Sequence, residues 1–307
     1  MARRPAQVHG FCLVDKPAGM TSHDVVGRLR RRFNERRIGH SGTLDPDATG
    51  VLIVAVGNAT RLLRFFSDLP KTYTARFITG VATDTLDNSG VVTRTADMSG
   101  VTLADARRVA ASLTGRIMQV PPMVSAIKID GKRLHELARE GITVEREARE
   151  IEVYSFDVEG PVEVRDGNPV FDVTVMCSSG TYVRTLADDF GTALGGCAHL
   201  GNLRRRAIGD FRVGESVRDD DSIDAAELRT VSAGLAHLPR VVVDEDVARW
   251  VLTGRPLEAA RLGVDSQIAV ATPDAVCAVV DDLDRVLAVY RIGDVCRPEV
   301  VLPAPLA

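Results

Sequence analysis

The residues best suited to chemistry lie in a loop rich in glycine, proline and aspartate that runs from Gly39 to Gly50. Asp45 stands near its centre, where glycine and proline can force an irregular backbone that approaches a ligand closely. A carboxylate there can attack a substrate covalently or stabilise positive charge that develops on it. Composition alone leaves a second interpretation open, in which the loop is a surface turn and Asp45 caps the next element.

Most other catalytic arrangements find little support in the chain. The six histidines are scattered, and the five cysteines include no Cys-x-x-Cys pair, so we expect no metal site and five reduced, mostly buried thiols. Gly131 and Lys132 lack the rest of a phosphate-binding loop, and there is no Gly-x-Ser-x-Gly sequence. Asp45 with Asp47 could superficially pass for the carboxylate pair of a glycoside hydrolase, which is the one serious enzymatic alternative.

The distribution of charge along the chain is more informative about binding partners than the net charge of −4. Residues 28–37 hold six arginines, and Arg204 to Arg206 form a second basic cluster. An acidic protein with such locally basic faces can still bind RNA, although an exposed helix surface explains the first cluster equally well. No apolar run is long enough for a membrane span or a signal peptide, so we expect a cytoplasmic protein that does not contact a membrane.

Hydrophobic periodicity predicts strands and helices that are interspersed, with several hairpin-like strand pairs. Thr21 and Asp24 have capping-box spacing before an apolar stripe of period four, and residues 51–56 resemble a buried central strand. Further elements are expected as strands at 11–14, 73–80, 151–158 and 170–177, and as helices at 103–114, 133–140 and 182–194. The pattern predicts an α+β fold with a mixed or antiparallel sheet.

The C-terminal part of the chain is predicted to be a small β-rich module. A boundary is expected near residues 236–246. After it come a short helix at 246–252 and β-like stretches near 267–272, 275–280 and 286–292.

Several ordered stretches resemble the TruB family of pseudouridine synthases. They are Asp15-Lys16-Pro17-Ala18-Gly19-Met20-Thr21-Ser22, Gly39-His40-Ser41-Gly42-Thr43-Leu44-Asp45-Pro46, Lys71-Thr72-Tyr73, Gly80-Val81-Ala82-Thr83-Asp84-Thr85-Leu86-Asp87, Gln119-Val120-Pro121-Pro122-Met123-Val124-Ser125-Ala126-Ile127-Lys128, Cys177-Ser178-Ser179-Gly180-Thr181-Tyr182-Val183-Arg184 and Ala198-His199-Leu200-Gly201-Asn202-Leu203-Arg204-Arg205. The likeness covers residues 11 to about 211, and its strength lies in the number and order of the stretches.

The resemblance implies a fold and a reaction. The fold is a catalytic domain over residues 1–240, built on a mixed, largely antiparallel sheet flanked by helices. A small C-terminal RNA-binding module resembling a reduced PUA domain follows over residues 241–307. The reaction is the isomerisation of the uridine at position 55, in the T-loop of transfer RNA, to pseudouridine, without cofactor or metal. The T-stem-loop is the implied partner, and the absence of a long basic tail predicts an enzyme that acts alone, without a guide RNA.

The resemblance also assigns site residues. Asp45 matches the catalytic aspartate, and five residues match positions that hold the RNA or the flipped base, or support the aspartate: His40, Tyr73, Tyr182, Arg184 and Leu203. Arg184 beside Asp45 would lower the pKa of that carboxyl group and keep it ionised. Tyr73 would stack on the uracil and move a proton, and Lys16 would either contact phosphate or end its loop.

Three departures qualify the match. Asp47 stands where family members often have an apolar residue, His135 where they often have tyrosine, and the likeness fades past residue 240. Two other hypotheses stay open at this point. One is an RNA-binding or RNA-folding module without turnover, and the other is a glycosidase-like hydrolase that releases free uracil.

Overall fold

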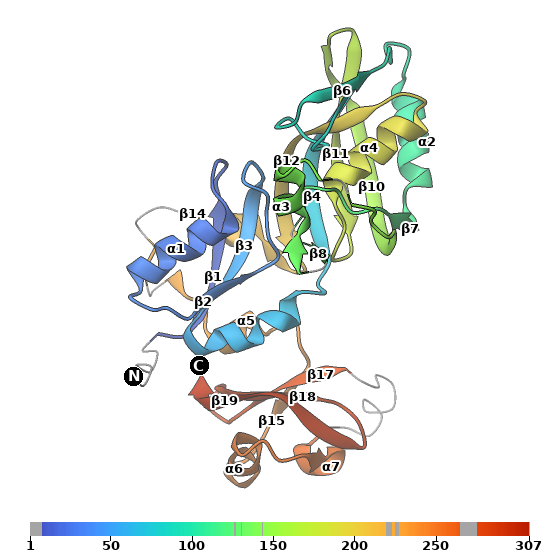
Figure 1. The fold of residues 1–307 in the computed structure, drawn as a ribbon. Helices are drawn as coiled ribbons and strands as arrows, with labels where there is room; N and C mark the ends of the chain where they lie inside the picture. Colours follow the sequence, from blue (N-terminus) through green and yellow to red (C-terminus); the bar gives the residue numbers. More distant parts are fainter. Residues whose placement is uncertain are drawn as a thin grey trace. The chain divides into compact units, whose positions relative to one another are not determined.

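The computed structural model describes residues 8–306 except 126, 130, 143, 219–222, 225–226 and 265–274. The chain divides into two compact units, which we describe separately (Figure 1). The first unit contains Met1–Pro46, Val51–Ser67 and Asp210–Ala307. The second contains Asp47–Gly50 and Asp68–Gly209.

The first unit begins with β1 (Gly10–Lys16), α1 (Ser22–Arg32) and β2 (Ile38–Ser41). In the strand order of the sheet, β1 lies between β14 (Val217–Arg218) and β3 (Thr49–Val56), and β2 pairs antiparallel with β3. A 3-10 helix, η1 (Gly57–Phe66), follows β3. The predicted strands at 11–14 and 51–56 are confirmed.

The start of α1 forms as its sequence predicts. Thr21 is the N-cap, and the capping box with Asp24 is complete, so two backbone amides at the helix start have side-chain partners. The apolar stripe then buries Val25 and Leu29 against β1 and β3 in one hydrophobic cluster. The helix ends at Arg32, so Arg36 and Arg37 of the first basic cluster lie beyond it.

The C-terminal part of the first unit is a β-rich module, as predicted. Its five-stranded sheet has the order β15-β17-β18-β19-β16. The strands are β15 (Arg240–Val242), β16 (Leu257–Glu258), β17 (Val276–Val280), β18 (Val286–Arg291) and β19 (Val295–Leu306), and the helices are α6 (Glu245–Leu252) and α7 (Ala259–Leu262). The short helix α5 (Val231–Gly234) precedes the module and contacts β1. The strand expected near 267–272 lies outside the described residues.

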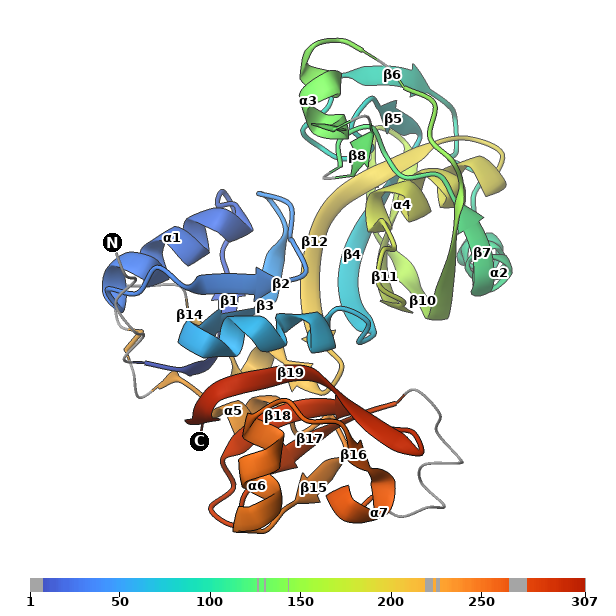
Figure 2. The ribbon, with the colours of Figure 1, turned by 60° about the horizontal axis from the view of Figure 1, so that its bottom comes forward.

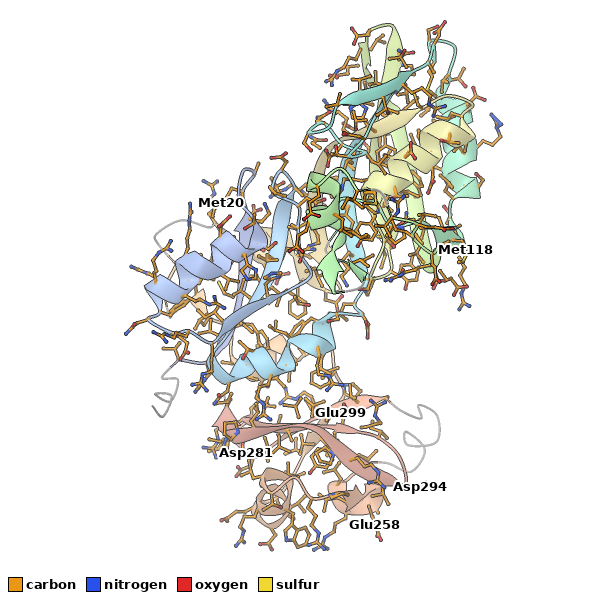
Figure 3. The ribbon with its side chains drawn as sticks, in the orientation of Figure 1. Met20, Met118, Glu258, Asp281, Asp294 and Glu299 are labelled. Carbon is orange, nitrogen blue, oxygen red and sulfur yellow. The ribbon has the colours of Figure 1, made fainter. Side chains whose placement is uncertain are left out.

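Two arginines of η1 hold this module to the rest of the first unit. Arg61 donates to the carbonyl oxygen of Val301 on β19 at 2.5 Å. Arg64 forms an ion pair of 3.0 Å with Glu299, which is labelled in Figure 3. Glu299 also pairs with Arg291 on the neighbouring strand, so one carboxylate connects η1 to two strands of the module.

The second unit is built on an antiparallel array in the order β12-β4-β11-β10-β7 (Figure 2). These strands are β12 (Ala198–Ile208), β4 (Lys71–Thr79), β11 (Asn168–Cys177), β10 (Arg149–Arg165) and β7 (Gly115–Gln119). The first two residues of β3, Thr49 and Gly50, pair in parallel with Arg204 and Arg205 on β12. The sheet is therefore mixed and largely antiparallel, and the predicted α+β class is confirmed.

The smaller elements of the second unit are three helices and two separate two-stranded sheets. They are α2 (Leu103–Ser112), α3 (Leu134–Arg139), α4 (Val183–Ala193), and the strand pairs β5 (Val81–Thr83) with β6 (Val92–Thr95) and β8 (Lys128–Ile129) with β9 (Lys132–Arg133). Two further short elements, β13 (Phe211–Arg212) and η2 (Val213–Glu215), belong to the first unit. No helix in the described part of the chain is long and apolar enough to cross a membrane.

Candidate active site

Asp45 lies in the loop between β2 and β3, and its side chain is half-buried. Its neighbour Leu44 is buried, as is Ala48 further along the loop, so the loop is anchored by apolar side chains on both sides of the aspartate. Gly42 has a φ of +74° and Gly50 a φ of +109°, which are left-handed values that favour glycine. Two of the glycines predicted to shape this loop therefore stand at positions where the backbone has a left-handed conformation.

A serine at the start of α1 fixes the backbone just before Asp45. The amide of Leu44 donates to Ser22 Oγ at 2.9 Å, and the same hydroxyl lies 3.3 Å from the carbonyl oxygen of Leu44. Ser22 is buried and directly follows the N-cap Thr21, so the capping box that starts α1 also places this hydroxyl. The role of Ser22 could not be predicted from the sequence, because its partner is 22 residues away.

Lys16 fixes the backbone just after Asp45. Its side chain is 0% exposed, and Nζ donates to the carbonyl oxygens of Pro17 at 2.9 Å, Met20 at 2.6 Å and Pro46 at 2.9 Å. Gly19 N–H adds a second bond to Pro46 O at 3.0 Å. The prediction that Lys16 binds substrate stays a prediction. The observed contacts instead join the β1–α1 loop, which carries Met20 (Figure 3), to the residue after Asp45.

His40 lies on β2, opposite Val54 of β3. Its ring is half-buried and meets the ring of His23 edge to face, with 6.1 Å between centroids. This contact places His40 in the first unit, on the strand that leads into the Asp45 loop. Its predicted contact with RNA stays a prediction.

Tyr73 and Leu203 lie on neighbouring strands of the second unit. Tyr73 is 9% exposed on β4, with Arg205 of β12 and Val175 of β11 opposite it. Leu203 is half-buried and lies opposite Ala75, two residues along β4. Residues directly opposite each other in an antiparallel pair share a face, so Tyr73 and Leu203 lie on one face of this array.

Two buried cations share that face with Tyr73. Arg205 is 1% exposed, and Lys71 stands two residues before Tyr73 on β4 and is also buried. Burial, with a smaller contribution from the nearby Arg205 charge, lowers the pKa of Lys71 to about 8. Arg205 was predicted to be part of a basic cluster, but only Arg206 of the three arginines is exposed.

Tyr182 is the N-cap residue of α4 and is half-buried. Its backbone is held from both sides by Gln119: Tyr182 N–H donates to Oε1 at 2.8 Å, and Nε2 donates to Tyr182 O at 3.2 Å. Gln119 is buried at the end of β7. It belongs to one of the recognised stretches, but its role could not be read from the sequence, because Tyr182 is 63 residues away.

Arg184 is 4% exposed on the first turn of α4. Its guanidinium donates to Thr85 O at 3.3 Å and Val124 O at 2.9 Å, and lies 3.7 Å from Asp87 Oδ2. Arg184 therefore joins two recognised stretches within the second unit. Its predicted effect on the pKa of Asp45 stays a prediction.

Other expected features of the chain can be located as well. All five cysteines are buried free thiols, as predicted. Among the described residues, no group of three or more His, Cys, Asp or Glu side chains is placed to hold a metal ion.

Comparison with known proteins bears on what this arrangement does. Residues 30–183 match the family model described as "TruB family pseudouridylate synthase (N terminal domain)", a span that includes Asp45 and Tyr73. The chain belongs to the TruB family. The enzymes of this family are isomerases, and the predicted family and class of activity are confirmed.

TruB-family relatives match nearly the whole chain. The "tRNA pseudouridine synthase B" of Mycobacterium sp. (strain KMS) is 45% identical over 276 residues, which cover 89% of this chain and 92% of the relative. That of Streptococcus thermophilus is 40% identical over 310 residues, covering 96% and 99%. Among solved structures, a "Cbf5-Nop10-Gar1 Complex" matches with a TM-score of 0.73 and 25% identity, covering 97% of this chain and 87% of that one.

Proposed function

We propose that this protein is a tRNA pseudouridine synthase that isomerises the T-loop uridine at position 55. The family match and the relatives named "tRNA pseudouridine synthase B" support the reaction and the substrate. The observation that supports Asp45 as the catalytic residue is the anchoring of its loop. Ser22 holds the residue before it and Lys16 the residue after it, so the carboxylate is presented from a rigid backbone.

In the reaction the uracil base leaves C1′ of the ribose, turns, and is joined to C1′ again through its own C5. The Asp45 carboxylate would attack the nucleotide or stabilise positive charge on the sugar. Confinement of the free uracil would keep its recapture fast and exclude water. The proposal does not depend on which atom the carboxylate attacks.

The other site residues would hold RNA or base. Tyr73 would stack on the flipped uracil and take part in the transfer of the C5 proton, and Tyr182 would line the pocket. Leu203 would form an apolar wall for the base, and His40 would fill the space that the flipped nucleotide leaves. Arg184 would keep the Asp45 carboxylate ionised, and Lys16 would support the loop or contact phosphate.

The remaining parts of the proposal concern partners and organisation. Residues 1–240 would form the catalytic domain, and 241–307 a reduced PUA-like module that binds RNA on the acceptor-stem side. The enzyme would act alone, without guide RNA, cofactor or metal, in the cytoplasm where transfer RNA is processed. Solved structures similar to this chain include complexes with partner proteins, so independence is the part that most needs a test.

The decisive experiment is incubation of the purified protein alone with an unmodified tRNA transcript, followed by position-resolved mapping of pseudouridine. We expect modification at the T-loop uridine and its loss in Asp45→Asn, which keeps the shape of the side chain and removes its charge. Asp47→Asn is the matched control, because Asp47 is an exposed carboxylate two residues away. Wild-type rates in Asp45→Asn would contradict the assignment.

The same assay separates the alternatives. Tritium release from C5-labelled uridine distinguishes turnover from RNA binding alone. Release of free uracil in place of retained, rearranged uridine would indicate a hydrolase.

A further inference from the structure

Gln119 uses its whole amide group on one other residue. It is 2% exposed at the end of β7, where Oε1 accepts from Tyr182 N–H at 2.8 Å and Nε2 donates to Tyr182 O at 3.2 Å. The orientation of the amide follows from these contacts, because the reverse orientation would set a donor against the Tyr182 N–H and an acceptor against its carbonyl oxygen. Gln119 therefore holds the backbone of Tyr182 at two points.

This two-point contact takes the place of a helix cap. Tyr182 is the N-cap residue of α4, and its own side chain makes no capping hydrogen bond. The preferred N-cap residues have a short side-chain oxygen that fixes the first turn, which tyrosine lacks. The Tyr182 carbonyl oxygen accepts the first helical bond, from Leu186 N–H at 3.0 Å, as well as the bond from Gln119. The position at which α4 begins is therefore fixed by a residue of β7.

The turn that leads into α4 is tied to the same pair of strands. Ser178 N–H donates to Glu152 O at 2.8 Å, and Glu152 N–H donates to Ser178 Oγ at 2.9 Å. Glu152 lies on β10, which pairs with β7. This strand pair thus holds both ends of the turn, Ser178 and Tyr182, while Gly180 between them has a φ of +85°. Without Gln119 the turn would keep its first anchor and lose its second.

The side chain of Tyr182 extends from the residue that Gln119 holds. It is half-buried, and within the described part of the chain it makes no hydrogen bond and no ring contact. The direction of the ring therefore depends mainly on the backbone to which it is attached. Gln119 is the side chain that fixes this backbone.

We infer that Gln119 is a positioning residue, which fixes the backbone of Tyr182 and so holds its ring in place for the flipped uracil. The inference assigns Gln119 no contact with the substrate. The effect on turnover rests on the proposed function of Tyr182, whereas the effect on the ring can be measured without RNA.

The first test follows the Tyr182 ring in the full-length protein without RNA. The chain has four tyrosines, so labelling with 3-fluorotyrosine gives four ¹⁹F signals, and Tyr182→Phe assigns the signal of Tyr182. Gln119→Met keeps a side chain of similar length and removes both hydrogen bonds, so we expect it to shift or broaden this signal. The signal of Tyr290, which is buried in the C-terminal module, should stay unchanged.

Gln119→Asn is a second variant for the same test. It keeps the polar amide but shortens the side chain by one methylene, so the amide cannot reach both backbone groups, and the Tyr182 signal should change in the same way. An unchanged Tyr182 signal in these variants would overturn the inference, whether or not the protein modifies tRNA.

The second test is a double-mutant cycle of single-turnover rates with saturating enzyme, over Gln119→Met, Tyr182→Ala and both changes together. Gln119→Met should lower the rate by about ten- to a hundredfold, the effect of a misplaced contact, while tRNA affinity stays within about twofold because phosphate contacts dominate it. If Gln119 acts through the Tyr182 ring, the double variant should be as slow as Tyr182→Ala alone, within about twofold. Losses that multiply, or a wild-type rate in Tyr182→Ala, would overturn the role in the reaction.

Asn168→Leu is the matched control for a loss of stability. Asn168 is a buried amide of the same unit, whose Oδ1 accepts from Met98 N–H at 2.6 Å and whose Nδ2 donates to Asp166 O at 3.3 Å. Asn168→Leu should lower the midpoint of urea unfolding about as much as Gln119→Met does, and leave the single-turnover rate within about twofold of wild type. Equal losses of rate in both variants would show that Gln119 acts on stability alone and would overturn the positioning role.

Discussion

Replacement of Lys16 by methionine would distinguish the two roles considered for this residue. Methionine keeps an apolar stem of similar length and removes the ammonium that three carbonyl oxygens share. Pro46 O also accepts from Gly19, so the described contacts leave two carbonyls, those of Pro17 and Met20, that depend on Lys16. Pro17 is exposed and Met20 is half-buried, so water can replace part of the lost hydrogen bonding, and we expect a loss of about 1–3 kcal/mol in the free energy of unfolding.

The effect on RNA binding should be small. The Lys16 side chain has no exposed surface, so its ammonium is not available to a phosphate in this structure. We therefore expect Lys16→Met to bind tRNA within about twofold of wild type, with an unchanged dependence on salt. The single-turnover rate should fall, because the backbone after Asp45 loses one of its two anchors.

The measurements are urea unfolding, tRNA affinity across a salt series, and single-turnover rates. Arg31→Met is the matched control for unfolding, since it removes the same charge from an exposed position on α1, and in the salt series it shows the effect expected when an exposed arginine that contacts phosphate is lost. An unfolding free energy within about 0.5 kcal/mol of wild type, the scatter expected of a surface change, would refute the anchoring role. A shallower salt slope, by about one phosphate contact, would support direct RNA binding instead.

Three further predictions concern other parts of the protein. Tyr73→Phe keeps the ring and loses the hydroxyl, so tRNA affinity should stay near normal while the single-turnover rate falls at least about a hundredfold, and a Phe variant as fast as wild type would exclude proton transfer. The affinity of wild type for tRNA should fall steeply with salt, because exposed arginines such as Arg28, Arg31 and Arg206 suggest phosphate contacts, and a flat log–log plot would argue against this. Because burial lowers the pKa of Lys71 to about 8, below its unfolded value, the unfolded chain binds more protons between about pH 8 and pH 10.5. Wild type should therefore gain stability relative to Lys71→Met as pH rises through that window, and an unchanged difference in unfolding free energy at pH 7.5 and pH 9.5 would contradict this.

Helix caps and strands were predicted correctly where the residues that determine them are close together in the sequence. The capping box at Thr21 and Asp24 lies within four residues, and the alternation along 170–177 follows directly from a strand with one face more buried than the other. The sequence of β12, by contrast, was recognised as a motif but not as a strand. Its alternation is broken by register shifts after Leu200 and after Arg205, and periodicity cannot reveal such bulges.

The candidate site also contains residues that the sequence predicted and residues that it could not predict. Asp45, Tyr73 and Arg184 could be proposed because their surrounding residues resemble a known family. The supporting residues Ser22 and Gln119 could not, because they act through backbone groups 22 and 63 positions away. Lys16 was proposed as a site residue, but its bond to Pro46, 30 positions away, could not be predicted. A hydrogen bond to a distant backbone group leaves no periodic or compositional signal in a single sequence.

The contacts between η1 and β19 affect how deletion variants should be interpreted. Removal of the chain after residue 240 would take away the RNA-binding surface proposed there, but it would also remove the partners of Arg61 and Arg64. The outer face of η1, which directly follows the strand that leaves the Asp45 loop, would then be exposed to water. A loss of activity in such a truncated protein would therefore not distinguish weaker RNA binding from a weakened first unit, whereas charge-removing substitutions on α6 and α7 would leave that support intact.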